Sequence, residues 1–358
     1  MFKTQSLKFK MTALAGLLAG AFMTQAAQAG LVKVDGSSTV FPVTEAVAEE
    51  FQKSMRGKTK VTVGISGTGG GFKKFCRGET DVQNASRPIL AGEMKDCKAA
   101  GVQFIELPVA FDALTVVVHK DHPLNAISVE DLKKMWEPAA QGKVMKWNDA
   151  NPAFPNAPLA LFGAGADSGT FDYFTEAITG KSKSSRGDFT ASEDDNVIVM
   201  GVSRNKNALG FFGYAYYAEN QDKIKGLDIS WKGGKPVEPS AANVLNGTYQ
   251  PLSRPIFIYV NAKSLANPEV RAFAEYYMKN APKLVAEVKY VPLPAKAYEY
   301  NLSALQKGRL GTKMGGENKV GLTVEQLMSR PATACAVAGR KPDKWATPMA
   351  RLPDSAAD

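Results

Sequence analysis

Three segments of this chain share one design, in which glycine and small hydroxyl residues run directly into a helix-forming stretch. They are Asp35-Gly36-Ser37-Ser38-Thr39-Val40, Gly67-Thr68-Gly69-Gly70-Gly71 and Asp167-Ser168-Gly169-Thr170. Each predicts free backbone N–H groups and hydroxyls at a helix N-terminus, where the helix dipole favours negative charge. One such site is common in proteins, but three in one chain indicate helices that converge on a single oxyanion.

The order of the predicted elements around these loops indicates an α/β fold. Strands and helices alternate with glycine turns between them, which is the order of a domain with a largely parallel sheet. The length of 358 residues favours two domains over one. Strands are expected at residues 31–34, 60–65, 104–109, 114–118, 159–162, 209–214 and 255–260, and helices at 42–55, 72–77, 169–178, 194–202 and 268–280.

The N-terminus has the pattern of a signal peptide. Three lysines before residue 11 precede an apolar stretch at 11–23, and Ala27-Gln28-Ala29 supplies small residues for a cleavage site. We therefore expect cleavage near Ala29, with residues 1–29 removed, and export to a bacterial periplasm. No later stretch of the sequence is long and apolar enough to span a membrane, so we expect a soluble mature chain.

The formal charge of +9 at pH 7 narrows the class of partner. Three of the basic residues lie in the predicted signal peptide, and the others are dispersed along the chain. The sequence has no helix-turn-helix or zinc-finger spacing, so we do not expect nucleic acid as a partner. A mild positive field that attracts small anions fits the three loops better.

The sequence contains three cysteines. Cys76 and Cys97 lie close in sequence, and export favours a disulfide between them over the alternative of two free thiols. Cys335 is left over, as a buried thiol or as an intermolecular partner. It lies in segment 331–358, which is rich in Ala and Pro and is expected to be a surface or partly disordered tail.

Sequence patterns for catalysis, cofactors and metals are weak. A nucleotide phosphate loop needs a glycine five residues before Gly180-Lys181-Ser182, where Thr175 stands. A serine hydrolase needs a base, but His119 and His122 lie in a predicted polar turn, and no nucleophile elbow surrounds the serines of the loops. The two histidines lack a clear third metal ligand, and the cysteines lack zinc spacing. We therefore expect no catalytic residues, no metal site and no cofactor.

Two arginines are candidates to balance a buried anion. Arg87 lies in Asn84-Ala85-Ser86-Arg87-Pro88-Ile89, where the following proline holds it in an extended segment. Its guanidinium matches the oxygens of a phosphate with paired hydrogen bonds, although a surface arginine bridged to a carboxylate fits this segment equally well. Arg186, in Ser185-Arg186-Gly187-Asp188, is the second candidate. The aromatic run at 211–217 is interpreted as a buried strand leading into a helix rather than as a platform for sugars.

Taken together, these segments resemble the substrate-binding proteins of bacterial phosphate ABC importers, the PstS type. The motifs occur in the family's order across nearly all of residues 30–310. They are the segments 34–42, 67–75, 84–89, 167–171, 192–196 and 208–216, with Trp136 and Trp147 around the Gly142-Lys143 turn. The resemblance implies that the chain captures inorganic phosphate and delivers it to the membrane permease of an ABC importer without performing chemistry. We expect a monomer.

The resemblance also implies the two-lobed fold of a type II-like periplasmic binding protein. Each lobe would hold a mixed, mainly parallel sheet flanked by helices. We place the two crossings between the lobes near residues 112–114 and 255–260. The expected division is 30–112 with 259–330 for the split first lobe and 113–258 for the second lobe. The ligand would lie in the cleft, and the lobes would close over it by a hinge.

The family's binding residues carry over onto the three loops, with two departures. Family members place an acid, which accepts the proton of hydrogen phosphate and rejects sulfate, in the loop that here holds Ser86 and Arg87. They also place an arginine just before the Ser-Gly-Thr turn, where this chain has Gly163-Ala-Gly-Ala-Asp167. The residues that carry over are Ser38, Thr39, Val40, Thr68, Gly69, Gly70, Ser168, Gly169 and Thr170.

These departures suggest that the charges have exchanged places. Arg87, with Arg186 as the second cation, would replace the missing arginine, and Asp112 or Asp167 would replace the missing acid. Another oxyanion such as sulfate or a phosphonate, an exported phosphatase-like enzyme, and a surface adhesin built on this fold remain as alternatives.

Overall fold

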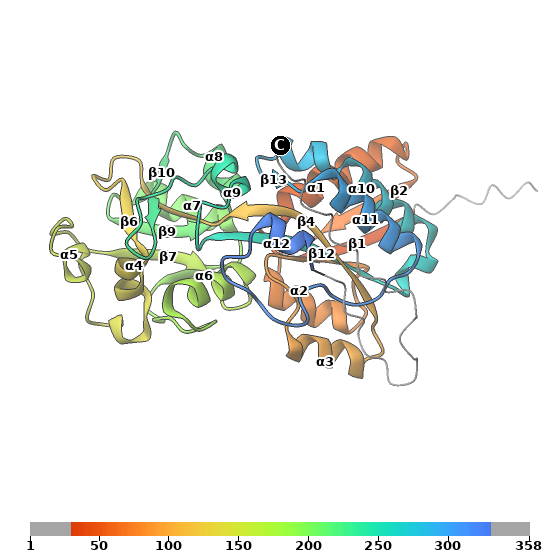
Figure 1. Ribbon diagram of the computed structural model, residues 1–358, viewed down its shortest axis with the longest axis horizontal. Helices are drawn as coiled ribbons and strands as arrows, with labels where there is room; N and C mark the ends of the chain where they lie inside the picture. Colours follow the sequence, from red (N-terminus) through yellow and green to blue (C-terminus); the bar gives the residue numbers. More distant parts are fainter. Residues whose placement is uncertain (1–29, 331–358) are drawn as a thin grey trace, which may run out of the picture.

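The computed structural model describes residues 30–330, which form two lobes side by side along the long axis of the molecule (Figure 1). Each lobe has its own sheet, and helices pack against both sheets. The expected signal peptide, the C-terminal tail and Cys335 lie outside the described residues.

The first lobe is built on a six-stranded mixed sheet. Next to the edge strand β2, β1 runs parallel to both of its neighbours, whereas β12 is antiparallel to β3 and β4. In sheet order the strands are β13 (Val291–Pro292), β4 (Phe104–Ala113), β12 (Ser253–Asn261), β3 (Val82–Ala85), β1 (Gly30–Gly36) and β2 (Thr59–Val63). Its helices are α1 (Phe41–Ser54), α2 (Gly67–Cys76), α3 (Ala91–Ala99), η2 (Ser264–Ala266), α10 (Pro268–Glu287) and α11 (Ala295–Gln306).

The second lobe is built on a five-stranded mixed sheet. Here β7 is parallel to β8 and β9, while β5 is antiparallel to β9 and β10. In sheet order the strands are β10 (Ile224–Gly226), β5 (Thr115–His119), β9 (Ala208–Phe212), β7 (Ala160–Ala164) and β8 (Thr190–Ser192). A two-stranded sheet joins β6 (Ala126–Ser128) and β11 (Asp228–Ser230). The helices are α4 (Val129–Trp136), η1 (Pro138–Ala140), α5 (Trp147–Ala150), α6 (Gly169–Thr179), α7 (Asp195–Arg204) and α8 (Tyr214–Glu219).

The chain crosses between the lobes at the ends of two neighbouring strands. It leaves the first sheet after β4 and enters the second sheet at Thr115. It returns through α9 (Ala241–Leu245), which packs against β4, and re-enters the first sheet at Ser253. This return ends just before residues 255–260, near which we placed it, and all of β12 pairs within the first sheet. The sequence of an apolar strand does not show whether the chain crosses between the lobes within the strand or just before it.

The sequence of α6 explains how its N-terminus is fixed. The helix is capped by Ser168, whose hydroxyl accepts from the Thr170 N–H at 3.1 Å, and it ends at Gly180 in the left-handed region with φ 83°. Phe174 of this helix stacks on Phe211 of β9, with ring centroids 3.8 Å apart. Phe211 is fully buried, so the interpretation of the aromatic run as a core strand is confirmed for its β9 part.

A disulfide joins two helices of the first lobe, as predicted. Cys76 at the end of α2 and Cys97 in α3 are bonded, with an S–S distance of 2.00 Å. Both residues are buried. A last short helix, α12 (Val324–Met328), follows a segment that contacts α6 of the second lobe through the Asn318–Glu176 hydrogen bond of 2.7 Å.

Candidate anion-binding site between the lobes

Three helix N-termini meet where the two lobes face each other. The first and third loops lead directly into α1 and α6, and the second loop, including Gly70, forms the first turn of α2. Thr39 Oγ1 lies 2.8 Å from Thr170 Oγ1, and the Gly69 N–H donates to the Asp167 carbonyl at 2.7 Å. The structure therefore brings the three glycine- and hydroxyl-rich loops together, although they are far apart in sequence.

The second and third loops approach so closely that only glycine fits between them. A Cβ on Gly169 would lie 2.5 Å from Thr68 Oγ1 and 2.8 Å from Ser86 Oγ. Thr68 and Ser86 are buried and share a hydrogen bond of 3.2 Å between their hydroxyls. The N-terminus of α6 is thus pressed against two hydroxyls of the first lobe, and its cap residue Ser168 is buried beside them.

Two tyrosines hold the first loop in place. The Tyr216 hydroxyl of the second lobe donates to the Ser38 carbonyl at 3.0 Å, and the Tyr290 hydroxyl donates to the Thr39 carbonyl at 2.7 Å. The Val40 N–H, which we expected to face the ligand, donates to the Ser37 carbonyl at 3.2 Å. The hydroxyl of Thr39 remains directed at the opposite lobe.

The cation at this junction is Arg254, which the sequence analysis did not select. It is fully buried at the start of β12. Its Nη2 donates to Thr170 Oγ1 at 2.9 Å and to Thr39 Oγ1 at 3.4 Å, and its Nη1 donates to the Gly169 carbonyl at 3.3 Å. Asp112 forms an ion pair with it at 2.9 Å from the facing position of β4. One guanidinium therefore contacts binding loops of both lobes.

The sequence does contain one feature that links Arg254 to Arg87, a repeated tetrapeptide that we did not use. Ser-Arg-Pro-Ile occurs at residues 86–89 and again at 253–256. The first copy follows β3 and the second begins β12, and these two strands are antiparallel neighbours with Ala85 opposite Phe257. The end of one strand and the beginning of the other lie at the same edge of the sheet. Both arginines therefore reach the boundary between the lobes.

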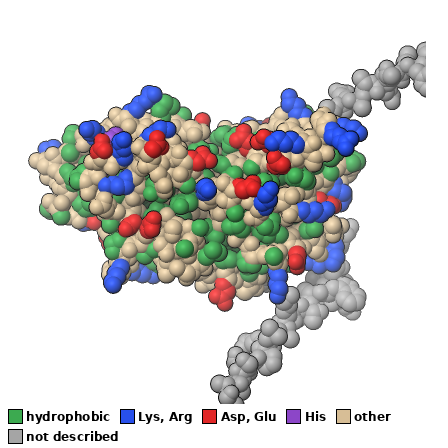
Figure 2. Space-filling model, turned by 90° about the horizontal axis from the view of Figure 1, so that it is seen from above, with side chains coloured by type: hydrophobic (Ala, Val, Ile, Leu, Met, Phe, Trp, Pro, Cys, Tyr) green, Lys and Arg blue, Asp and Glu red, His purple; other side chains and the backbone are tan. Residues whose placement is uncertain are grey.

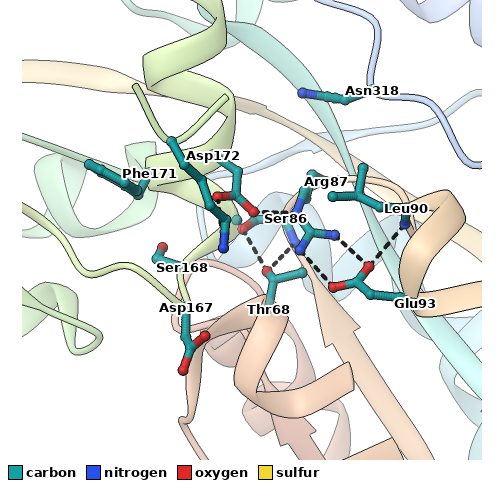
Figure 3. Close-up of polar contacts among 12 residues, drawn as sticks. Thr68, Ser86, Arg87, Leu90, Glu93, Asp167, Ser168, Phe171, Asp172 and Asn318 are labelled. Carbon is teal, nitrogen blue, oxygen red and sulfur yellow. Dashed lines mark hydrogen bonds and ion pairs between the residues drawn. The ribbon is translucent and has the colours of Figure 1, made fainter. Parts of the chain in front are cut away.

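Arg87, our first candidate cation, is already engaged by two carboxylates (Figure 3). Its Nε donates to Asp172 of α6 at 2.6 Å, and Nη1 and Nη2 each donate to a Glu93 oxygen at 2.8 Å. Burial alone would lower the pKa of Arg87, but the hydrogen bonds and charges of Glu93 and Asp172 raise it. All three guanidinium nitrogens of Arg87 therefore donate to carboxylate oxygens.

The side chains of two other predicted residues, Arg186 and Asp167, contact neither Arg254 nor the hydroxyls of Thr39 and Thr170. Arg186 pairs with Asp188 at 2.5 Å and donates to the backbone carbonyls of Met135 and Val144, so it anchors a loop within the second lobe. This contact lowers the pKa of Asp188 to about 2. Asp167 pairs at 2.8 Å with Lys73, and both side chains are exposed.

Asp195, at the start of α7, is a second buried acid at the junction. Its Oδ1 accepts from the Ser38 hydroxyl at 3.1 Å, the Gly213 N–H faces the carboxyl group, and Oδ2 forms no hydrogen bond within residues 30–330. Burial raises its pKa to about 7, against opposing effects of Ser38 and Arg254. Asp112 is one of the two acids we had suggested. Its Oδ2 accepts from Arg254 and its Oδ1 accepts from the Tyr214 N–H at 2.9 Å, so both oxygens are occupied.

The two histidines lie in the second lobe, among aromatic and backbone partners. His122 stacks on Trp147 with ring centroids 4.3 Å apart, and burial lowers its pKa to about 4. His119 Nδ1 accepts from the Asp121 N–H at 3.2 Å. Among the described residues, no group of three or more His, Cys, Asp or Glu side chains is arranged to hold a metal ion.

A model of the PBP superfamily domain matches residues 23–281. The chain belongs to this superfamily. Protein SphX of Synechococcus elongatus is 53% identical over 84% of this chain and 89% of its own length. The phosphate-binding protein PstS of Staphylococcus saprophyticus is 38% identical over 77% of this chain and 84% of its own length. The family predicted from the ordered motifs is thereby confirmed.

The comparison with solved structures gives the same family and fold. A possible phosphate binding protein from Planctomyces limnophilus is 47% identical, with a TM-score of 0.58, over 78% of this chain and 98% of its own. A phosphate ABC transporter substrate-binding protein from Clostridium perfringens shares the fold, with a TM-score of 0.63 at 24% identity. Members of this family are substrate-binding proteins. In the described part of the chain, no helix has the length and apolarity needed to cross a membrane.

Proposed function

We propose that this protein captures inorganic phosphate between its lobes, outside the cytoplasm, and delivers it to the membrane permease of an ABC importer. The relatives named as phosphate-binding proteins support the ligand and the transport role. Binding without chemistry fits a family of substrate-binding proteins. On the face in Figure 2, basic side chains are interspersed with acidic ones rather than gathered in a stripe, which fits a small anion better than nucleic acid.

The observation that carries this proposal is the position of Arg254. The guanidinium touches Thr39 of the first lobe and the Gly169–Thr170 turn of the second lobe, so one cation serves both sides. A bound phosphate would exchange the direct contacts among these groups for contacts with its own oxygens. It would also gain the dipoles of the helices that begin at the loops. We propose the loop residues Ser38, Thr39, Thr68, Ser86, Ser168, Gly169 and Thr170, with Arg254, as the binding set.

We propose that Asp195 accepts the proton of bound phosphate. Its free carboxylate oxygen is buried beside Ser38, where a neighbouring oxyanion would have to supply a donor. Hydrogen phosphate carries such a proton, whereas sulfate has none at neutral pH. Above the raised pKa of about 7, the ionised Asp195 and a sulfate oxygen can only accept hydrogen bonds, so their contact would be strongly unfavourable. Selectivity for phosphate would follow from this one oxygen.

Calorimetric titration of the phosphate-stripped mature protein tests the proposal. We expect one tight site for phosphate, weaker or equal binding of arsenate, and no heat from sulfate. Tight binding of sulfate with a flat phosphate titration would replace phosphate with another oxyanion. Steady release of phosphate from an ester substrate would show an enzyme instead. Analytical ultracentrifugation with and without phosphate tests the expectation of a monomer.

A further inference from the structure

Arg87 connects the two lobes through groups that are almost completely buried. Glu93, its bidentate partner, belongs to α3 of the same lobe, whereas Asp172 belongs to α6 of the other lobe. The side chains of Arg87 and Asp172 are only 2% and 1% exposed. Figure 3 shows Arg87 between these two carboxylates, with Thr68 and Ser86 beside it. The contact with Asp172 therefore exists only while the lobes are together.

Both ends of this contact are directly coupled to the binding loops. Arg87 follows Ser86, whose N–H donates to Thr68 Oγ1 at 3.1 Å. Asp172 lies one turn into α6, and its N–H donates to the carbonyl of the cap residue Ser168 at 3.1 Å. The ion pair between Arg87 and Asp172 therefore holds the second and third loops at a fixed separation. It does so without contacting an anion bound between the loops.

Each partner also has a second contact within its own lobe. Arg87 retains the paired hydrogen bonds to Glu93, and Asp172 Oδ1 lies 3.7 Å from Lys183 Nζ of the second lobe. Lys183 is half exposed and can follow Asp172 into water. Neither charge is therefore left alone when the lobes separate. The free-energy difference between the formed and the broken contact is therefore small, because neither state leaves a buried charge without a partner.

We infer that Arg87 is a positioning residue, which stabilises the closed arrangement through Asp172 and does not touch the bound oxyanion. This inference rests on the proposed function. It follows that loss of the contact lets the lobes reopen sooner but leaves the capture of the anion unchanged. The same variant must also affect every oxyanion equally, because the groups that contact the ligand remain in place.

Stopped-flow kinetics with inorganic phosphate and arsenate test this inference on the mature protein. For Arg87→Ala and Asp172→Ala we expect dissociation to be about 10-fold faster, with association changed by less than about 2-fold. The factor should be the same for phosphate and arsenate. The double variant should lose no more than either single variant, because both remove one contact. Lys73→Ala, which breaks the exposed interlobe pair with Asp167, is the matched control and should change neither rate by more than about 2-fold.

The outcomes separate the inference from the proposed function. Failure of the wild type to bind phosphate would contradict the proposed function before any variant is compared. Slower association in Arg87→Ala, or a loss that differs between phosphate and arsenate, would show that Arg87 contacts the ligand. Additive losses in the double variant, or unchanged dissociation in both single variants, would also overturn the inference. If Arg87→Ala does not fold, Asp172→Asn, which keeps the shape of the side chain, carries the same test with a smaller expected factor.

Discussion

Two copies of Ser-Arg-Pro-Ile lie on neighbouring strands of one sheet and place two buried arginines at the same boundary. Arg254 has one carboxylate, and its remaining donors contact hydroxyls and a carbonyl of the binding loops. Arg87 has two carboxylates, Glu93 and Asp172. The local motif is identical, so the difference comes from the residues that the fold brings to each guanidinium. Of the two arginines, only Arg254 has hydrogen bonds to hydroxyls of the binding loops, which an oxyanion can replace without displacing a carboxylate.

The largest expected effect comes from Arg254→Ala. The substitution removes the cation that contacts both lobes and leaves Asp112 buried without it. We expect phosphate affinity to fall by about 2–5 kcal/mol, the usual cost of truncating one partner of a buried charge pair. Arg254→Lys should recover only part of the affinity, because a point charge cannot make the contacts of a planar guanidinium. Calorimetry measures both variants. Affinity that is unchanged in Arg254→Ala but lost in Arg87→Ala would reverse the comparison.

Asp195→Asn is expected to have the next largest effect, on selectivity rather than on closure. The amide donates to an oxyanion where the carboxylate accepts from it, so phosphate binding should weaken and sulfate binding should appear. Competition titrations of the two anions at pH ~8, above the raised pKa of Asp195, measure the change. Sulfate binding that stays absent in this variant would show that Asp195 does not face the ligand.

The same substitution should change the pH dependence of stability. Burial raises the pKa of Asp195 from 3.8 to about 7, so between these values the folded state holds a proton that the unfolded state has lost. Wild-type stability should therefore fall as the pH rises through this range. Asp195→Asn should be more stable than the wild type above pH ~7, and the gain should vanish below pH ~4. Urea unfolding across this range measures the difference, and a gain that is constant with pH would contradict the raised pKa.

Loss of the Cys76–Cys97 disulfide should affect binding less and should resemble the Arg87 variants. The bond joins α2 to α3, and α3 carries Glu93, which holds Arg87. In the double Cys→Ser variant we expect a loss of about 3 kcal/mol of stability by the chain-entropy model and a modestly faster dissociation of phosphate. Thermal unfolding and stopped-flow kinetics measure the two effects. Slower association with unchanged dissociation would instead connect the disulfide to the ligand-contacting loops.

Arg186→Ala should have the smallest effect on binding. Its partners, Asp188 and the carbonyls of Met135 and Val144, all lie within the second lobe. We expect lower thermal stability and phosphate affinity within about 2-fold of the wild type. Calorimetry measures the phosphate affinity of this variant, which serves as a reference for the affinities of the Arg254 and Arg87 variants. A loss as large as that of Arg254→Ala would place the cation in the second lobe.

Local patterns predicted much of the fold, because glycine-hydroxyl turns and apolar runs are set by neighbours in sequence. Such patterns predicted the three loops, the core strand at Phe211 and the cysteine pair. Arg254 was not, because it lies within an apolar strand and its role depends on Asp112, which is 142 residues away. For the same reason, the sequence left Arg87 open between a cation that binds the ligand and an arginine bridged to a carboxylate. Nothing local shows that Asp172 of the other lobe occupies it.

The position of a bound oxyanion relative to the two arginines tests the central claim most directly. A crystal structure of the mature protein with arsenate, with diffraction recorded at the arsenic absorption edge, locates the anion without ambiguity. We expect the arsenic peak among Arg254, Thr39 and Thr170, with Arg87 still paired to Asp172. A peak whose oxygens contact Arg87, with Arg254 held only by Asp112, would contradict the account.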